Sequence, residues 1–154
     1  MEPNELGHLV KRTQQALRNA IDPALGDLGL TTAQFAALYN LARQPGASNA
    51  ELARSSFVTP QTMIRVVGGL ERRGLLSRSP SPTRGRVLEA QLSDRGRGVL
   101  EEAQRRVDGV HVRMLDGVPP AEVERLVGWL THIAAALETA GKPPGGSFGR
   151  PVSG

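Results

Sequence analysis

The chain has 154 residues, a formal net charge of +4, 39% hydrophobic residues and no cysteine. That length and composition suit one globular domain with room for additional helices. The absence of cysteine excludes disulfides, thiolate metal sites and thiol redox sensing. Residues 1–7 contain no apolar signal core, and no stretch approaches about 18 uninterrupted apolar residues. We therefore expect a cytoplasmic protein without a membrane span.

Basic residues are concentrated between residues 54 and 97. This segment contains nine arginines and three acidic residues, so the remainder of the chain is slightly acidic. A basic segment on a weakly charged body is the electrostatic footprint of a polyanion-binding protein. A solvated arginine-rich surface would give the same counts, so charge alone leaves both interpretations open.

Two helices are expected in the first third of the chain. Apolar residues at helical spacing predict the first at about residues 4–20, and Pro23 should end or kink it. A Thr31–Gln34 pair has the pattern of a capping box, in which each residue bonds the backbone amide of the other. The helix that it opens should continue to about residue 43.

A helix-turn-helix pattern follows. Ser48 and Glu51 form a second capping box before a short helix at residues 49–55, and Phe57 begins a tight turn. Thr59–Pro60 is the clearest helix start in the chain, because threonine is a preferred cap and proline is pre-organised for the first helical position. The apolar spacing of this helix is set by Met63, Val66, Val67 and Leu70.

A β-hairpin and two long helices complete the predicted fold. Residues 75–78 and 86–92 are extended runs on either side of a Pro/Ser/Gly turn. The helix from residue 93 to about 115 has apolar spacings of 3 and 4, which suit helix pairing. We expect a mainly α chain with a small β-hairpin. It divides into a winged helix-turn-helix lobe at 31–95, N- and C-terminal dimerisation helices at 1–30 and 96–141, and a flexible tail at 142–154.

Each part of such a lobe has a use on DNA. The start of the second helix can enter the major groove, where Gln61 and Arg65 have the groups to read base edges. Arginines on the hairpin can reach the minor groove, where the negative potential is enhanced. The candidate DNA-binding residues are Ser48, Thr59, Pro60, Gln61, Thr62, Arg65, Arg78, Arg84 and Arg86. Any one of them alone could be an ordinary cap or an exposed residue, and it is their combination that favours DNA.

The segments LERRGLLSR at 70–78 and RVLEAQLSDRG at 86–96 resemble the multiple-antibiotic-resistance regulator (MarR) family. The helix order is similar over residues about 5–140. The resemblance implies a transcriptional regulator, a homodimer built from the first and last two helices, that binds a roughly palindromic operator. It also implies release from DNA by a small aromatic or phenolic effector, for which His8 and Arg12 are candidate contacts. The lack of cysteine argues against the peroxide-sensing branch.

Two positions depart from the family pattern. Arg86 takes the place of the family's wing arginine, but Arg84 stands where an aspartate is usual, which removes a partner for nearby arginines and makes the tip more basic. Gly68 and Gly69 stand in the predicted recognition helix where polar or charged residues are usual. Each destabilises that helix by about 1 kcal/mol relative to alanine. Close backbone approach and drift both remain open as explanations.

Other functions find little support. His8, His111 and His132 lie on three different predicted helices without paired spacing, so no local metal site is indicated. No Ser/His/Asp constellation and no Gly-rich phosphate loop is visible, so we expect neither an enzyme nor a cofactor. The remaining alternative is a winged-helix protein-interaction module without specific DNA binding. The outer helices could pack within one chain, although three helices outside the lobe favour two-fold assembly.

Overall fold

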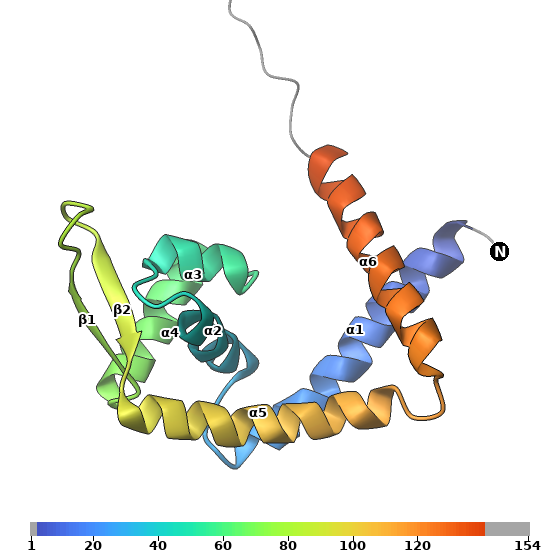
Figure 1. Cartoon of the computed structure of the whole chain (residues 1–154), viewed down its shortest axis with the longest axis horizontal. Coiled ribbons are helices and arrows are strands. Elements are labelled where there is room, and N and C mark those ends of the chain that lie inside the picture. Colours follow the sequence, from blue (N-terminus) through green and yellow to red (C-terminus); the bar gives the residue numbers. More distant parts are fainter. Residues whose placement is uncertain (1–2, 141–154) are drawn as a thin grey trace, which may run out of the picture. The chain divides into compact units, whose positions relative to one another are not determined.

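The structure is a computed structural model, and it describes residues 3–140. It confirms a mainly α chain with one small hairpin, as Figure 1 shows. The elements in chain order are α1 (Pro3–Gly26), α2 (Thr32–Arg43), α3 (Asn49–Ser55), α4 (Pro60–Arg72), β1 (Leu76–Pro80), β2 (Leu88–Leu92), α5 (Asp94–Met114) and α6 (Pro120–Ala140). The tail predicted at residues 142–154 lies outside the described residues.

The chain divides into two compact units, residues 1–114 and 115–154. The first unit contains α1 to α5 and the hairpin. The described part of the second unit is essentially the amphipathic helix α6. Among residues 3–140, no helix has both the length and the apolar character that crossing a membrane would require.

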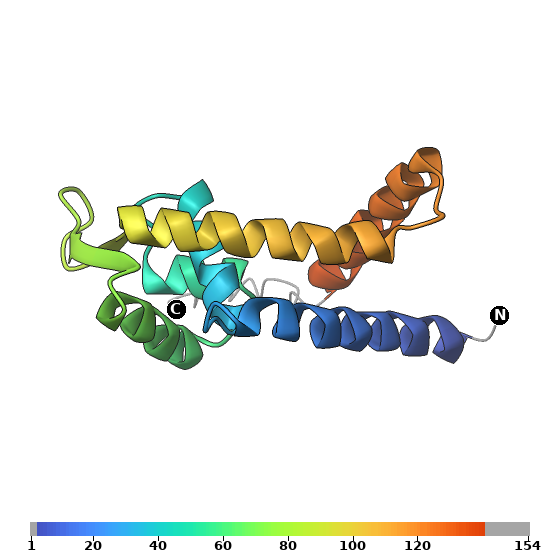
Figure 2. The same ribbon diagram turned by 90° about the horizontal axis from the view of Figure 1, so that it is seen from below.

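Helix α1 is longer than the sequence predicts. It continues through Pro23 to Gly26, so the expected end near residue 20 is wrong. Ile21 and Leu25 are buried in the core, and α1 runs antiparallel to α5 along much of its length (Figure 2). The missing amide of a proline normally disfavours a helix interior, and we attribute the continuation to the apolar packing of this last turn.

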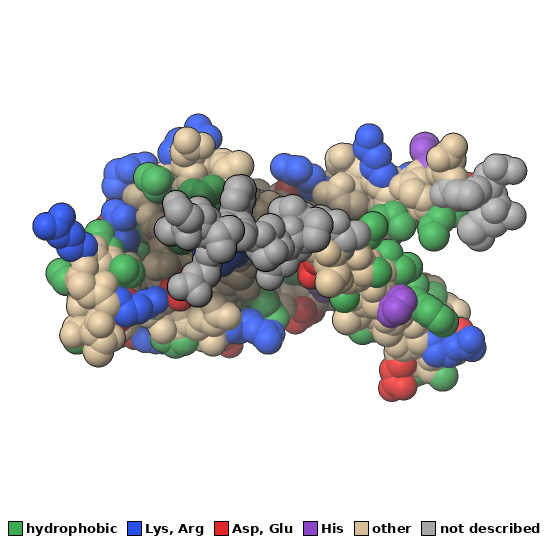
Figure 3. Space-filling view, turned by 90° about the horizontal axis from the view of Figure 1, so that it is seen from above, with side chains coloured by type: hydrophobic (Ala, Val, Ile, Leu, Met, Phe, Trp, Pro, Cys, Tyr) green, Lys and Arg blue, Asp and Glu red, His purple; other side chains and the backbone are tan. Residues whose placement is uncertain are grey.

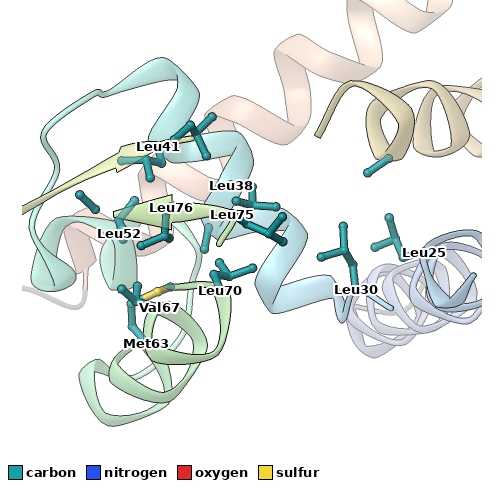
Figure 4. Packing of buried hydrophobic residues seen from close by; sticks show 14 of the residues in the cluster. Leu25, Leu30, Leu38, Leu41, Leu52, Met63, Val67, Leu70, Leu75 and Leu76 are labelled. Carbon is teal, nitrogen blue, oxygen red and sulfur yellow. The ribbon is translucent and has the colours of Figure 1, made fainter. Parts of the chain in front are cut away.

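One apolar core fills the first unit (Figure 4). Leu38 and Leu41 of α2 meet Leu52 of α3 and the inner face of α4, and strand residues close the core from the other side. The buried residues of α5 belong to the same cluster and face α1 and α2. The fully buried large side chains are Leu25, Leu38, Leu41, Leu52, Met63, Leu70, Leu75 and Val67. Part of the α5 apolar pattern is therefore used within one chain, not between chains.

The predicted helix caps are all present. The Thr31 and Ser48 hydroxyls accept the amides of Gln34 and Glu51, and the two N3 side chains reach back to the cap amides. At α4 the Thr59 hydroxyl accepts the amide of Thr62 at 3.2 Å. These local bonds satisfy amides that a helix start otherwise leaves unpaired.

The hairpin, called the wing here, comprises β1, β2 and the loop between them. The strands pair antiparallel with Leu76 opposite Leu92 and Pro80 opposite Leu88, so β1 extends two residues beyond the predicted run. The loop before α3 joins its free side: the Ala90 amide donates to the Ala47 carbonyl, and the Gly46 amide donates to the Ala90 carbonyl. These bonds hold the wing against the start of α3.

The junction between the wing and α5 depends on Ser93 and Gly96. The Ser93 hydroxyl donates to the Gly74 carbonyl at 2.6 Å and accepts the Gly96 amide at 3.0 Å. A Cβ atom on Gly96 would lie 1.9 Å from the Leu75 carbonyl oxygen. Only glycine permits this close approach, which locks the first turn of α5 to the end of α4.

Candidate nucleic-acid interface

Helix α4 has one buried face and one exposed face. Met63, Val67 and Leu70 point into the core (Figure 4). Gln61 and Arg65 lie on the opposite side and are exposed. The helix is thus held firmly by its inner face, while its outer face presents side chains that can donate to base edges and phosphates.

The start of α4 is fixed by its cap. The Thr59 hydroxyl accepts the Thr62 amide and donates to the Thr62 hydroxyl at 2.9 Å. Pro60 occupies the first turn and is exposed. Ser48 caps α3 in the same way and is half-buried. For Ser48 and Thr59 the structure thus shows a capping role, and their DNA contacts stay a prediction.

The turn between α3 and α4 is built on Phe57, where the sequence predicts the start of a tight turn. Its φ is +54°, a left-handed conformation that is uncommon outside glycine, and its side chain is 90% exposed. The strained turn sets the angle between the two helices of the helix-turn-helix.

Arg84 does not form a free basic tip. Its guanidinium donates to both Glu51 carboxylate oxygens at 3.0 Å and to the Gly46 carbonyl at 2.6 Å, with a longer bond to Glu89 at 3.4 Å. The added arginine is thus itself partnered within the fold, whereas Arg86 makes no ion pair in the described part of the chain. Glu51, on α3, supplies the closer carboxylate, and Glu89 of β2 the more distant one.

Glu51 is held in its ionised form. The backbone amide of Ser48 donates to its carboxylate, and the Arg84 guanidinium bonds it from the other side. These bonds lower the pKa of Glu51 to about 2 from its usual 4.5, the amide being the larger cause. One carboxylate thus serves both the α3 capping box and the attachment of the wing.

Arg78 and Arg73 are also engaged within the fold. The Arg78 guanidinium donates two hydrogen bonds to one carboxylate oxygen of Glu71, Oε2, from Nε at 3.0 Å and from Nη2 at 2.7 Å. Arg73 donates to the Leu28 and Gly29 carbonyls in the loop after α1. Arg78, predicted to contact DNA, thus fastens β1 to α4 in the free protein, because its acidic partner lies on the neighbouring helix.

Arg86 differs from the other wing arginines, Arg78 and Arg84, in its lack of an acidic partner among the described residues. It is exposed, and within residues 3–140 it makes no ion pair. Arg65 on α4 is likewise exposed and without an ion pair in the described part of the chain. Figure 3 shows Lys and Arg side chains spread over the end of the first unit that carries the wing. The available cations therefore lie on both predicted DNA-contacting elements.

Several cavities in the first unit are large enough for small molecules. One, of about 480 Å³, lies between α2, β2 and α5, where Tyr39, Leu92 and Leu100 meet the side chains of Arg43 and Arg97. A second, of about 410 Å³, lies between α1 and α5, and a third, of about 310 Å³, lies between α1, α2 and the Phe57 turn. His8 and Arg12 are exposed on α1 and line none of these three cavities. Nor does any group of three or more His, Asp or Glu residues within the described ranges form a metal site.

Known proteins match this chain in sequence and in structure. A model of the MarR family matches residues 28–87. The HTH-type transcriptional repressor Rv2887 of Mycobacterium tuberculosis is 42% identical over 110 residues, which is 71% of this chain and 79% of that protein. The chain belongs to the MarR family. The family resemblance inferred from the two motifs is thereby confirmed.

Solved structures of MarR-family members have the same architecture. The Rv2887 complex with salicylic acid has a TM-score of 0.68 at 37% identity, covering 83% of this chain and 95% of that one. The transcriptional repressor CouR, from Rhodococcus jostii RHA1, bound to a 23-mer DNA duplex has a TM-score of 0.76 at 29% identity, covering 84% and 92%. This MarR-family chain is therefore a winged helix-turn-helix transcriptional regulator.

Proposed function

We propose that this chain is a ligand-responsive repressor that binds a palindromic operator as a homodimer. The observation that carries the proposal is α4, whose inner face is fully buried and whose outer face exposes Gln61 and Arg65. A MarR-family repressor of the same fold, CouR, has been captured on a DNA duplex. MarR-family proteins are non-enzymatic DNA-binding regulators, and we propose the same here, without a cofactor and with action in the cytoplasm.

The predicted site residues have different roles in this proposal. Gln61 and Arg65 read base edges, since glutamine can bond adenine and arginine can bond guanine in the major groove. Ser48, Thr59, Pro60 and Thr62 lie at helix starts, where amides and hydroxyls favour phosphate. Arg86 reaches the minor groove. Arg78 and Arg84 support the binding surface through Glu71 and Glu51.

Dimerisation is proposed for residues 1–30 and 96–141, outside the lobe at 31–95. Helix α1, the end of α5 and helix α6 each expose large apolar side chains, and such patches on a protein surface commonly mark interfaces. These are Leu6, Leu9, Val10, Val112, Met114, Leu126, Val127, Trp129, Leu130, Ile133 and Leu137. Two-fold symmetry would place one recognition helix on each half of a palindrome.

A small aromatic acid or a phenol is the proposed effector. Rv2887 has been solved with salicylic acid and CouR with p-coumaroyl-CoA. The cavity between α2, β2 and α5 offers matching chemistry: an aromatic ring and leucines for the ring, and guanidinium groups for a carboxylate. His8 and Arg12 remain candidates only for a ligand on the exposed face of α1.

Selection of duplexes from a random-sequence library tests this function. We expect the full-length protein to enrich an inverted repeat that also occurs near its own gene, and we expect an aromatic acid such as salicylate to weaken that complex. A protein-interaction module would enrich no sequence and bind all duplexes weakly and equally, which would overturn the proposal.

A further inference from the structure

The guanidinium of Arg72 lies against a glycine pair in the middle of α4. A Cβ atom placed on Gly68 would be 3.4 Å from Arg72 Nη1, and one placed on Gly69 would be 3.8 Å from Nη2. The Arg72 side chain thus folds back toward the start of the helix. It lies beside the positions where residues 68 and 69 have no side chain.

The fold itself does not require these glycines. Neither has a positive φ, and their nearest neighbours are the ends of the flexible Arg72 and Gln34 side chains at ordinary contact distance. Gly96 differs, because there a Cβ atom would strike a backbone carbonyl. Glycine weakens a helix interior relative to alanine, so the pair lowers the stability of α4. No contact within the described residues requires glycine at either position.

Gly68 lies on the outer face of α4. One side of this helix carries residues at i, i+4, i+7 and i+11, which are Gln61, Arg65, Gly68 and Arg72. That side is opposite the buried residues Met63, Val67 and Leu70. Arg72 is exposed and within residues 3–140 makes no ion pair.

We propose that Gly68, Gly69 and Arg72 determine specificity in the DNA complex. The missing side chains let the second half of α4 approach the floor of the major groove. They also leave room for the Arg72 guanidinium to lie along the helix, in line with Arg65, and bond the edge of a guanine. This inference rests on the proposed function. It adds Arg72 as a second arginine that contacts a base edge, two helical turns after Arg65.

Alanine at the glycines separates stability from recognition. Gly68→Ala, Gly69→Ala and Arg72→Gln are made in the full-length chain. They are assayed on a duplex selected by the wild-type protein and on a random duplex of equal length. We expect each alanine variant to raise the unfolding midpoint by about 2–4 °C yet bind the selected duplex about tenfold more weakly. Arg72→Gln should lose a similar factor. Binding to the random duplex should change less than about twofold for all three.

Gly98→Ala is the matched control. Gly98 lies within helix α5, and an added Cβ atom there has no neighbour within 4 Å. This variant should gain stability in the same way and keep wild-type affinity for both duplexes. Full affinity of the alanine variants for the selected duplex would overturn the inference, as would equal losses on both duplexes for Arg72→Gln. If the wild type selects no sequence at all, the proposed function fails and the inference falls with it.

Discussion

At the scale of single residues, the wing arginine Arg84 has an unexpected partner. Arg84 stands where the family usually has aspartate, and it is bound by Glu51 of α3 and by the Gly46 carbonyl. The sequence could not reveal this pairing, because the two residues are 33 positions apart and only the fold brings them together. The ion pair between Arg84 and Glu51 therefore links the wing to the first helix of the helix-turn-helix.

The charge on Glu51 should make part of the stability depend on pH. Its pKa is about 2 in the folded protein and ordinarily 4.5, so its contribution is present above pH 4.5 and is lost as pH falls toward 2. Glutamine can still form a capping box, so Glu51→Gln removes mainly the charge. We expect unfolding free energies of wild type and variant to differ at pH 7 and to converge between pH 4.5 and 2. A pH-independent difference would contradict this, and Glu124→Gln on α6 is the control.

Alanine in place of the wing-loop arginines Arg84 and Arg86 should have different effects. Arg84→Ala breaks bonds within the fold, so it should lower both the unfolding temperature and DNA affinity. Arg86→Ala removes an exposed cation, so it should keep the unfolding temperature, weaken binding across sequences and reduce the salt slope by about 1. Calorimetry and salt titrations of the two variants check this. Similar effects of both on stability would refute the division of roles.

Arg65 is expected to act on sequence preference. Loss of a base-reading arginine costs about 1–3 kcal/mol on the correct sequence. Arg65→Ala should therefore lower the affinity for the selected duplex and relax the base preference at one position of each half-site. Repeating the selection with the variant measures this directly. An unchanged base preference would show that Arg65 does not contact a base edge.

At the scale of elements, local signals predict most of this fold. The capping boxes at Thr31 and Ser48 and the Thr59–Pro60 start appear where the sequence indicates them, because these bonds form between residues three apart. The continuation of α1 past Pro23 was not predictable, since tertiary packing against α5 decides it. Pairing of Arg78 with Glu71 was missed because strand and helix residues meet only after the chain turns at Gly74.

The junction of the wing and α5 should be intolerant of any side chain at Gly96. A Cβ atom would overlap the Leu75 carbonyl oxygen, so Gly96→Ala must move the first turn of α5 or the end of α4. Overpacking of this kind typically costs about 1–3 kcal/mol. Denaturant unfolding should show that loss, whereas Gly98→Ala two residues later should be neutral or stabilising. Equal stability of the two variants would show that the junction relaxes freely.

At the scale of the whole molecule, the basic and the apolar exposed side chains gather on different parts of the chain. The arginine-rich segment lies in the lobe, whereas the exposed apolar side chains lie on α1, the end of α5 and α6. If the apolar helices hold two copies together, the contacts between the two copies set the distance between their recognition helices. Sedimentation should then give about twice the chain mass of 16.4 kDa at micromolar concentration.

The most direct test compares one duplex containing both selected half-sites with the same duplex in which one half-site is scrambled. Affinity of the full-length protein is measured for each at low and at physiological salt. Simultaneous docking of two recognition helices predicts a preference of at least about a hundredfold for the intact palindrome and a steep fall of affinity with salt. Equal, weak affinity for both duplexes would contradict sequence-specific binding by this protein.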